Sequence, residues 1–142
     1  MNITAITQNN FPSAIALLNK NNLPTEDISD KTGLFVLEEE NKVIGTIALE
    51  HDNSDALLRS LGVSEEKRGT GLGKELVAFI EDYARKQGLQ NIYLLTTTAA
   101  NFFAKRDYHV IDRNSVSQFI KNTSEYCSVC PASATVMKKE LK

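Results

Sequence analysis

Cysteine, proline and glycine are scarce in this chain, and tryptophan is absent. Its 142 residues include 2 Cys, 3 Pro, 7 Gly and no Trp. Cys127 and Cys130 are too few for a disulfide framework and too close together to join distant elements. The low glycine and proline content excludes a collagen-like or low-complexity chain. We therefore expect a globular protein that is held together by apolar packing.

The sequence also lacks an excess of charge of one sign, and it lacks a long apolar run. Lys and Arg number 16 against 18 Asp and Glu, which gives a formal net charge of −2. No overall basic field therefore favours nucleic acid or an anionic membrane surface as a partner. No segment approaches the ~18 apolar residues of a membrane span, and residues 1–6 do not resemble a signal peptide. We expect a cytoplasmic protein that binds any anion locally.

The apolar content is sufficient for one domain. Hydrophobic residues make up 42% of the 142 residues, and a chain of this length fits a single compact unit. We therefore expect residues 1–142 to form one domain around one core, as a monomer or a homodimer.

Alternating apolar residues and polar turns predict an antiparallel meander in the first half of the chain. In order, the expected elements are a strand at 3–5, a helix at 12–19, a helical turn at 25–28, and strands at 34–37, 43–49 and 56–63.

From Gly71 the apolar period becomes helical. A stripe that includes Leu72, Leu76 and Ile80 predicts an amphipathic helix, with Glu81 on its polar face, that ends at Gly88. The apolar run 92–95 is typical of a strand buried on both faces, and a β-helix-β unit of this length implies parallel pairing. The remaining expected elements are a short helix at 99–105, a strand at 108–111, a helical segment at 115–122 and a strand at 134–137.

The segment before this helix is rich in glycine. Gly69, Gly71 and Gly73 let a ligand approach the backbone closely, while the first helical N–H groups and the positive end of the helix dipole point to the same place. Arg68 and Lys74 add two cations. We therefore interpret the loop as a diphosphate site, and the alternative is a glycine-rich helix entry that binds nothing.

Spacing excludes two common phosphate loops. A P-loop needs two glycines separated by four residues and followed by Lys and Ser or Thr, whereas three residues separate Gly69 from Gly73, and Glu75 follows Lys74. The dinucleotide fingerprint G-x-G-x-x-G also fails, because the spacing here is G-x-G-x-G.

The loop instead resembles a motif of a known family. Arg68-Gly69-Thr70-Gly71-Leu72-Gly73 is similar to the R/Q-x-x-G-x-G/A pattern of the GCN5-related N-acetyltransferases (GNAT). The resemblance implies an α/β (α+β) fold with a mixed, mostly antiparallel, splayed sheet of six to seven strands and about four helices. It also implies acetyl-CoA as co-substrate, no metal, and a small-molecule amine as acceptor.

The resemblance further implies a set of cofactor contacts. Backbone groups of the strand that splays from its parallel neighbour are expected to face the pantetheine arm, and the loop is expected to hold the diphosphate. The expected cofactor-binding residues are Leu61, Gly62, Val63, Arg68, Gly69, Thr70, Gly71, Leu72, Gly73, Lys74, Asn101 and Phe103.

Three short segments resemble the arsenic-resistance N-acetyltransferase subgroup: residues 58–61, 94–103 and 130–134. The second is also similar to acetyltransferase domains of N-acetylglutamate synthases. Both resemblances imply an amino-acid-like acceptor. We expect its contacts from Arg59, whose geometry favours a carboxylate, from Ser60 as a polar group beside the thioester, and from the hydroxyl of Thr97. The alternatives are an arginine on a solvated face, a serine that only forms hydrogen bonds, and a threonine that favours a strand.

The residues that transfer protons in many relatives are missing. Phe103 stands where relatives often place Tyr, and Leu57 stands where they often place Glu, so neither position can move a proton. Glu50 is the candidate general base, with His51 acting through water or bulk solvent as alternatives. Both Glu50 and His51 also fit solvated turn residues. A non-catalytic acetyl-CoA-binding or arsenical-sensing module therefore remains the rival to an enzyme.

The spacing Cys127-Ser128-Val129-Cys130 is typical of redox or metal sites, and thiolates also bind trivalent arsenicals. Structural zinc needs four ligands, and the sequence offers no second pair nearby. We therefore expect no metal.

Overall fold

The computed structural model describes residues 3–23, 25, 28, 33–123, 126 and 134–141. Most of the helical turn expected at 25–28 lies outside these residues, as do Cys127, Cys130 and most of the segment 130–134.

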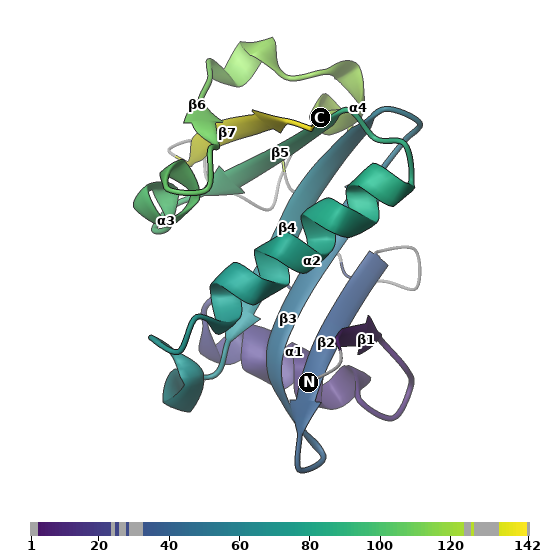
Figure 1. Ribbon diagram of the computed structural model, residues 1–142, viewed down its shortest axis with the longest axis vertical. Helices are drawn as coiled ribbons and strands as arrows, with labels where there is room; N and C mark the ends of the chain where they lie inside the picture. The colour runs from purple at the N-terminus through teal and green to yellow at the C-terminus, as the bar shows by residue number, and fades with distance from the viewer. Residues whose placement is uncertain are drawn as a thin grey trace. The chain divides into compact units, whose positions relative to one another are not determined.

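Seven strands and four α-helices make up the regular structure of the described residues (Figure 1). In chain order they are β1 (Ile3–Ala5), α1 (Phe11–Lys20), β2 (Gly33–Glu39), β3 (Lys42–His51), β4 (Asp55–Val63), α2 (Leu72–Lys86), β5 (Asn91–Thr96), α3 (Ala100–Ala104), β6 (His109–Val110), α4 (Gln118–Lys121) and β7 (Thr135–Glu140). The expected elements are confirmed within a few residues. The helical segment expected at 115–122 is instead a 3-10 turn, Arg113–Ser115, followed by the short α4.

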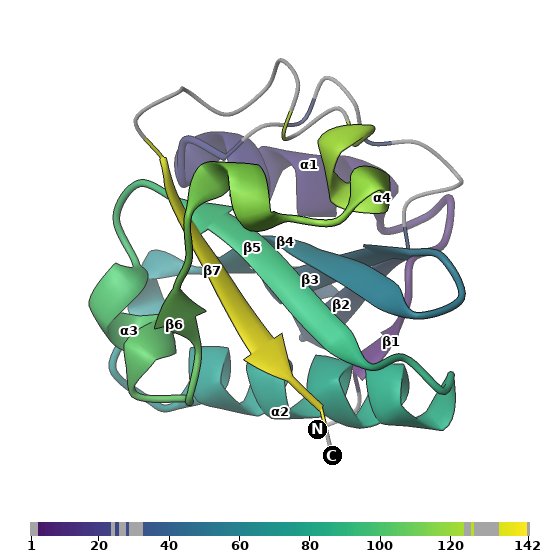
Figure 2. The ribbon, with the colours of Figure 1, turned by 90° about the horizontal axis from the view of Figure 1, so that it is seen from above.

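The strands form one mixed sheet in the order β1-β2-β3-β4-β5-β7-β6. The pairs β1–β2, β2–β3, β5–β7 and β6–β7 are antiparallel, and β5 and β7 lie side by side in Figure 2. The pair β4–β5 is parallel, as the β-helix-β unit predicts. Its register joins Asp55–Leu57 to Asn91–Tyr93, whereas β4 continues to Val63 and β5 to Thr96.

The chain divides into two compact units, Met1–Glu50 with Arg59–Tyr83, and His51–Leu58 with Ala84–Lys142. In the first unit, α1 packs on β2 and β3 through the buried residues Ala14, Leu17, Leu34, Val36, Val43 and Ala48. In the second unit, a separate cluster contains Leu57, Tyr93, Leu95, Val116, Ile120, Ala134 and Val136. Each of these clusters is described within its own unit, and a single domain over residues 1–142 stays a prediction.

The amphipathic helix α2 follows its predicted stripe. Leu72, Leu76 and Ile80 are at most 5% exposed. Gly88, with φ 78°, lies directly after the helix in the left-handed region that ends helices. Glu81 was expected on the polar face but is only 7% exposed, because the buried stripe is wide enough to include the position next to Ile80. In the part of the chain that the structure describes, no helix has both the length and the apolar character to cross a membrane.

Candidate functional site

The glycine loop adopts a conformation that requires glycine at two of its three positions. Gly69 has φ 82° and Gly71 has φ 88°, both in the left-handed region that side chains disfavour. A Cβ atom built at either position meets no atom within 4 Å, so the space beside the loop backbone is open. Gly73 lies inside α2, within the first helical turn. The loop therefore combines an open backbone surface with a helix start.

The N-terminus of α2 offers backbone donors at the end of this loop. The N–H of Glu75 donates to Gly71 O at 3.1 Å. The N–H groups of residues 72–74 precede this bond and have no acceptor inside the helix, because the first turn of any helix leaves its donors unpaired. Lys74 is exposed beside them. These donors, the helix dipole and the ammonium group together fit an anion such as a diphosphate.

Arg68 at the start of the loop is oriented by a residue that sequence reasoning missed. Its Nη2 donates to Asn21 Oδ1, and Asn21 Nδ2 donates to Val63 O at 3.3 Å. Asn21 lies directly after α1 and thus connects this helix, the end of β4 and the loop. Asn21 and Arg68 also line a cavity of about 370 Å³, together with Lys20 and Ser64. No local pattern identifies Asn21, because 47 positions separate it from Arg68.

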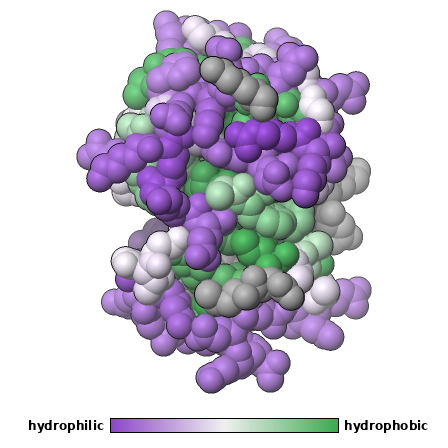
Figure 3. All heavy atoms as spheres, in the orientation of Figure 1, coloured by the Kyte–Doolittle hydropathy of each residue, from purple (hydrophilic) through white to green (hydrophobic). Residues whose placement is uncertain are grey.

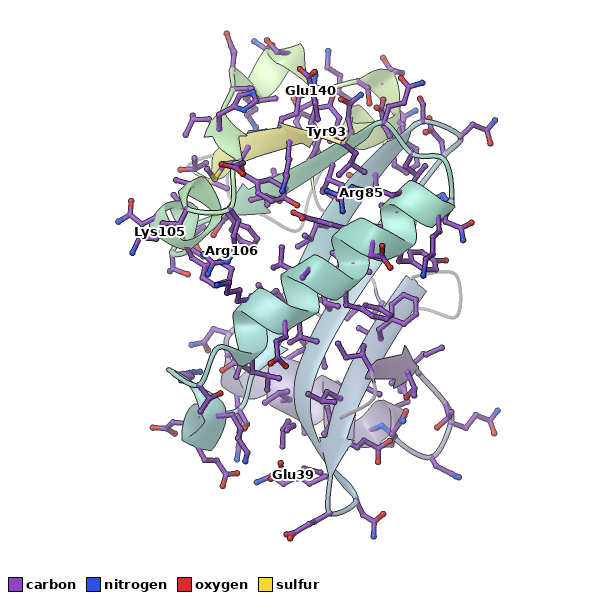
Figure 4. All side chains as sticks on the ribbon, in the orientation of Figure 1. Glu39, Arg85, Tyr93, Lys105, Arg106 and Glu140 are labelled. Carbon is purple, nitrogen blue, oxygen red and sulfur yellow. The ribbon has the colours of Figure 1, made fainter. Side chains whose placement is uncertain are left out.

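Two ion pairs connect the tip of the β2–β3 hairpin to a 3-10 turn, Glu65–Lys67, that precedes the glycine loop. Lys42 Nζ lies 2.6 Å from Glu66 Oε1, and Lys67 Nζ lies 2.8 Å from Glu39 Oε1. Glu39 is labelled beside the hairpin in Figure 4. The hydrogen bond from Lys42 lowers the pKa of Glu66, and the hydrogen bond to Glu39 raises the pKa of Lys67. Both pairs are solvent-exposed, so they orient the turn more than they stabilise it.

The three predicted backbone contacts in β4 are not equivalent. Ser64 N–H donates to Ile44 O on β3 at 2.8 Å. Because successive N–H groups of a strand point to opposite edges, Val63 and Leu61 direct theirs away from β3, whereas Gly62 directs its own toward β3. A Cβ atom at Gly62 would lie 3.0 Å from Thr46 Oγ1, so this glycine serves close packing. Leu61 and Val63 are therefore the better candidates for donors to a ligand.

Ser60 interrupts the regular conformation of β4. Its φ is 58°, a left-handed value that is rare for a residue other than glycine in a strand. Its carbonyl oxygen accepts a hydrogen bond of 2.8 Å from Thr46 Oγ1, and Thr46 is fully buried. Strained residues of this kind gather at functional sites.

Arg59 and Glu50 form an ion pair in the same unit. Arg59 Nη1 donates to Glu50 Oε2 at 3.0 Å, and the exposed fractions of the two side chains are 1% and 26%. The alternative of an arginine on a solvated face is therefore wrong, because the guanidinium is buried beside a carboxylate. Direct contact between Arg59 and a substrate carboxylate stays a prediction, and it requires the guanidinium to become accessible.

His51, the alternative base, is exposed at the end of β3. Its Nδ1 lies 2.9 Å from Asp52 O. The next turn is closed by Asp52, whose Oδ1 accepts from the N–H groups of Asp55 at 2.7 Å and Ser54 at 2.9 Å. These two backbone hydrogen bonds lower the pKa of Asp52. The turn therefore gives β3 a defined end next to Glu50.

The second unit contains the other predicted site residues. Asn101 and Thr97 are exposed, on α3 and in the turn after β5. Phe103 is 4% exposed, and its ring packs edge-on against Phe102 and Tyr108 with centroid distances of 5.1 and 5.4 Å. Leu57 is fully buried in the apolar cluster of this unit.

Polar side chains are common on one face of the molecule. Hydrophilic residues cover most of the face shown in Figure 3. Within the described ranges, no group of three or more His, Cys, Asp or Glu residues is arranged to hold a metal ion.

Comparison with known proteins decides the family. The sequence model of the acetyltransferase (GNAT) family matches residues 4–110, which is more than half of the chain. The chain belongs to this family. An amino-acid acetyltransferase from Pseudomonas fluorescens (strain Pf0-1) is 39% identical over 75 residues, which are 51% of this chain and 17% of that protein. This GNAT chain therefore matches less than a fifth of the length of that relative.

Solved structures share the fold of this GNAT chain. N-acetylglutamate synthase from Neisseria gonorrhoeae, complexed with coenzyme A and N-acetyl-glutamate, has a TM-score of 0.80 at 18% identity over 100% of this chain and 36% of that chain. Rv2747 from Mycobacterium tuberculosis, in complex with CoA and NLQ, has a TM-score of 0.79 at 18% identity and is covered over 100% of both chains. At these identities the likeness shows the fold, and it confirms the mixed α/β GNAT architecture.

Proposed function

We propose that this protein transfers the acetyl group of acetyl-CoA to the amine of a small, amino-acid-like acceptor. The observation that carries the proposal is the open loop at Gly69 and Gly71, which leads into the free N–H groups of α2 between the cations Arg68 and Lys74. Family membership supports the reaction class. The name of the Pseudomonas relative and the coenzyme A in the solved neighbours support the acceptor class and the co-substrate.

The residues present fit acetyl-CoA. The loop residues and the start of α2, from Arg68 to Lys74, would hold the diphosphate, and Leu61 and Val63 direct their backbone N–H groups away from β3. Asn101 and Phe103 remain proposed contacts on α3. When bound, acetyl-CoA supplies an acetyl group that is already activated as a thioester.

The chain must then bring an amine into its neutral form. Glu50 is the proposed base: its carboxylate is 26% exposed, so it can exchange a proton with an acceptor or with solvent. Arg59 bonds one of its oxygens, and a carboxylate has a second oxygen that accepts a proton from an ammonium group. The proton then returns to solvent, which also supplies the proton for the departing thiolate.

The acceptor class is proposed to include amines that carry a carboxylate. Thr97 is exposed and available as an acceptor contact, and Ser60 keeps this role as a prediction. The buried Arg59 takes this role only if its guanidinium becomes accessible. Glutamate-like arsenicals are one member of this class, and only the subgroup resemblance of three short segments supports them.

Thioester turnover with a panel of amines tests the proposal. Free thiol should be released only when an acceptor amine is present, and faster with carboxylate-bearing amines than with matched neutral amines. Release with every carboxylate-bearing and neutral amine at equal rates would refute the acceptor class. Binding of acetyl-CoA without thiol release above background would support the rival function, a non-catalytic module, which the apolar Leu57 and Phe103 favour.

A further inference from the structure

A chain of hydrogen bonds connects the candidate base to the irregular residue of β4. Arg59 Nη1 donates to Glu50 Oε2 at 3.0 Å, and Arg59 Nε donates to Ser60 Oγ at 3.2 Å. Thr46 Oγ1 donates to Ser60 O at 2.8 Å. Arg59, Ser60 and Thr46 are 3%, 8% and 0% exposed, whereas Glu50 is the only one of the four that is not buried. The network therefore extends from the core of the first unit to a carboxylate at its surface.

The contact between Arg59 and Ser60 is possible only because the strand is irregular. Adjacent side chains of a regular strand point to opposite faces of the sheet. The left-handed φ of 58° at Ser60 breaks this alternation, as in a β-bulge, and brings its hydroxyl to the guanidinium of the preceding residue. Thr46 holds the carbonyl of the same residue from β3. The backbone distortion and the placement of Arg59 are therefore parts of one arrangement.

The burial of Arg59 decides how it can act. Its side chain is 1% exposed, so in this conformation the guanidinium does not offer a pair of N–H donors to a ligand carboxylate. Its planar guanidinium instead fixes the directions of its hydrogen bonds, and one of them ends on Glu50. An acceptor amine would meet the carboxylate and would be affected by the guanidinium only through it.

We propose that Arg59 is a positioning residue for proton transfer: it fixes the carboxylate of Glu50, while the hydroxyl of Ser60 holds Arg59 and the hydroxyl of Thr46 holds the carbonyl of Ser60. The inference rests on the proposed function and assigns the deprotonation of the acceptor amine to this network. Arg59 thus contributes to the rate of the chemical step and not to the affinity for acetyl-CoA or for the carboxylate of the acceptor.

A double-mutant cycle tests this assignment. We expect Arg59→Met to lower kcat by about 10–100-fold, the loss typical of a misplaced catalytic group. We expect KM for the acceptor and CoA affinity by calorimetry to stay within about two-fold, because neither ligand contacts Arg59. In the Glu50→Gln background the same substitution should change kcat by less than about two-fold, because effects that act through one group are not additive.

The control substitution is Arg85→Met, which removes an exposed arginine from the last turn of α2, labelled in Figure 4. It should leave all parameters unchanged. If Arg59→Met does not fold, Arg59→Lys retains the charge but not the planar fork, and the same cycle applies with a smaller loss. Thermal unfolding of every variant separates loss of structure from loss of positioning.

Three results would overturn the assignment. Multiplicative effects of Arg59→Met and Glu50→Gln would show that Arg59 acts independently of the carboxylate. A large rise in KM for carboxylate-bearing acceptors alone would show that Arg59 binds the substrate directly. An unchanged kcat in Glu50→Gln would show that Glu50 is not the base and that Arg59 does not position one, while the proposed acetyltransferase function would stand. By contrast, a parent protein that acetylates no amine would refute the proposed function itself.

Discussion

Glycine in the loop can serve a left-handed backbone or leave room for the diphosphate. Replacing Gly71 and Gly73 separately distinguishes these two reasons. Gly71 has φ 88°, whereas Gly73 lies within the first turn of α2. An alanine in the left-handed conformation costs about 1–2 kcal/mol. An alanine in place of a helical glycine stabilises by up to about 1 kcal/mol. We therefore expect Gly71→Ala to destabilise the protein and Gly73→Ala to leave its stability unchanged or to raise it.

Cofactor affinity should not follow stability in this pair. If the diphosphate lies against the loop backbone and the first N–H groups of α2, a Cβ atom at either position obstructs its approach. Gly71→Ala and Gly73→Ala should then both weaken CoA binding, although only Gly71→Ala destabilises the fold. Each N–H hydrogen bond that is lost to a charged group corresponds to about 1.5–3 kcal/mol, or roughly 10–150-fold in Kd.

Calorimetry with CoA and urea unfolding, both carried out on parent, Gly71→Ala and Gly73→Ala, provide the two measurements. Gly88→Ala is a matched control, since Gly88 has φ 78° with open space around it but lies after the opposite end of α2. It should destabilise the protein without a change in CoA affinity. Unchanged CoA affinity in both loop variants would refute the diphosphate site, whatever happens to their stability.

Four further expectations follow from the same structure. Arg68→Ala should weaken CoA binding by about 10-fold or more and reduce its salt dependence, because a charged donor to the diphosphate is lost; calorimetry at two salt concentrations measures both. Glutamate-like acceptors should show a higher kcat/KM than matched neutral amines in a thiol-release assay. Phe103→Tyr should lower the unfolding midpoint, because a hydroxyl is added to a ring that is 4% exposed and packed against Phe102 and Tyr108; a hydroxyl that finds a partner would instead leave the midpoint unchanged and raise kcat. The pair of Glu66 with Lys42 stabilises the protein above pH 4.5 and is lost as the pH falls through the lowered pKa of Glu66, so Lys42→Met should flatten the acid limb of a stability–pH curve.

Local patterns in the sequence predict the elements of the fold and the position of the glycine loop well. The stripe of α2, the parallel β4–β5 pair and the glycine loop depend on residues close in sequence, and the structure has all three. Only the structure shows that Gly69 and Gly71 have left-handed φ while Gly73 is helical. Spacing identifies the motif, but the conformation of each glycine depends on where the helix begins.

Contacts between distant residues were not predictable in the same way. Asn21 meets Arg68 across 47 positions, and Thr46 meets Ser60 across 14. Neither pair has a local signature, because a polar residue that bonds a distant backbone or side chain is indistinguishable in sequence from one that bonds water. The sequence therefore identified Arg68 and Ser60 but not the residues that orient them.

Arg59 shows why the expectation of an arginine on a solvated face is wrong. Strict alternation places Leu58 and Arg59 on opposite faces of β4, and on that basis a solvated arginine is one of the two expected outcomes. Residues 56–60 are all buried, so both faces of β4 are covered there, and the irregular backbone at Ser60 lies where its hydroxyl meets the Arg59 guanidinium. A buried arginine needs a carboxylate nearby, and the end of β3 supplies Glu50. The guanidinium therefore bonds the candidate base on one side and the hydroxyl of the irregular residue on the other, and strict alternation predicts neither contact.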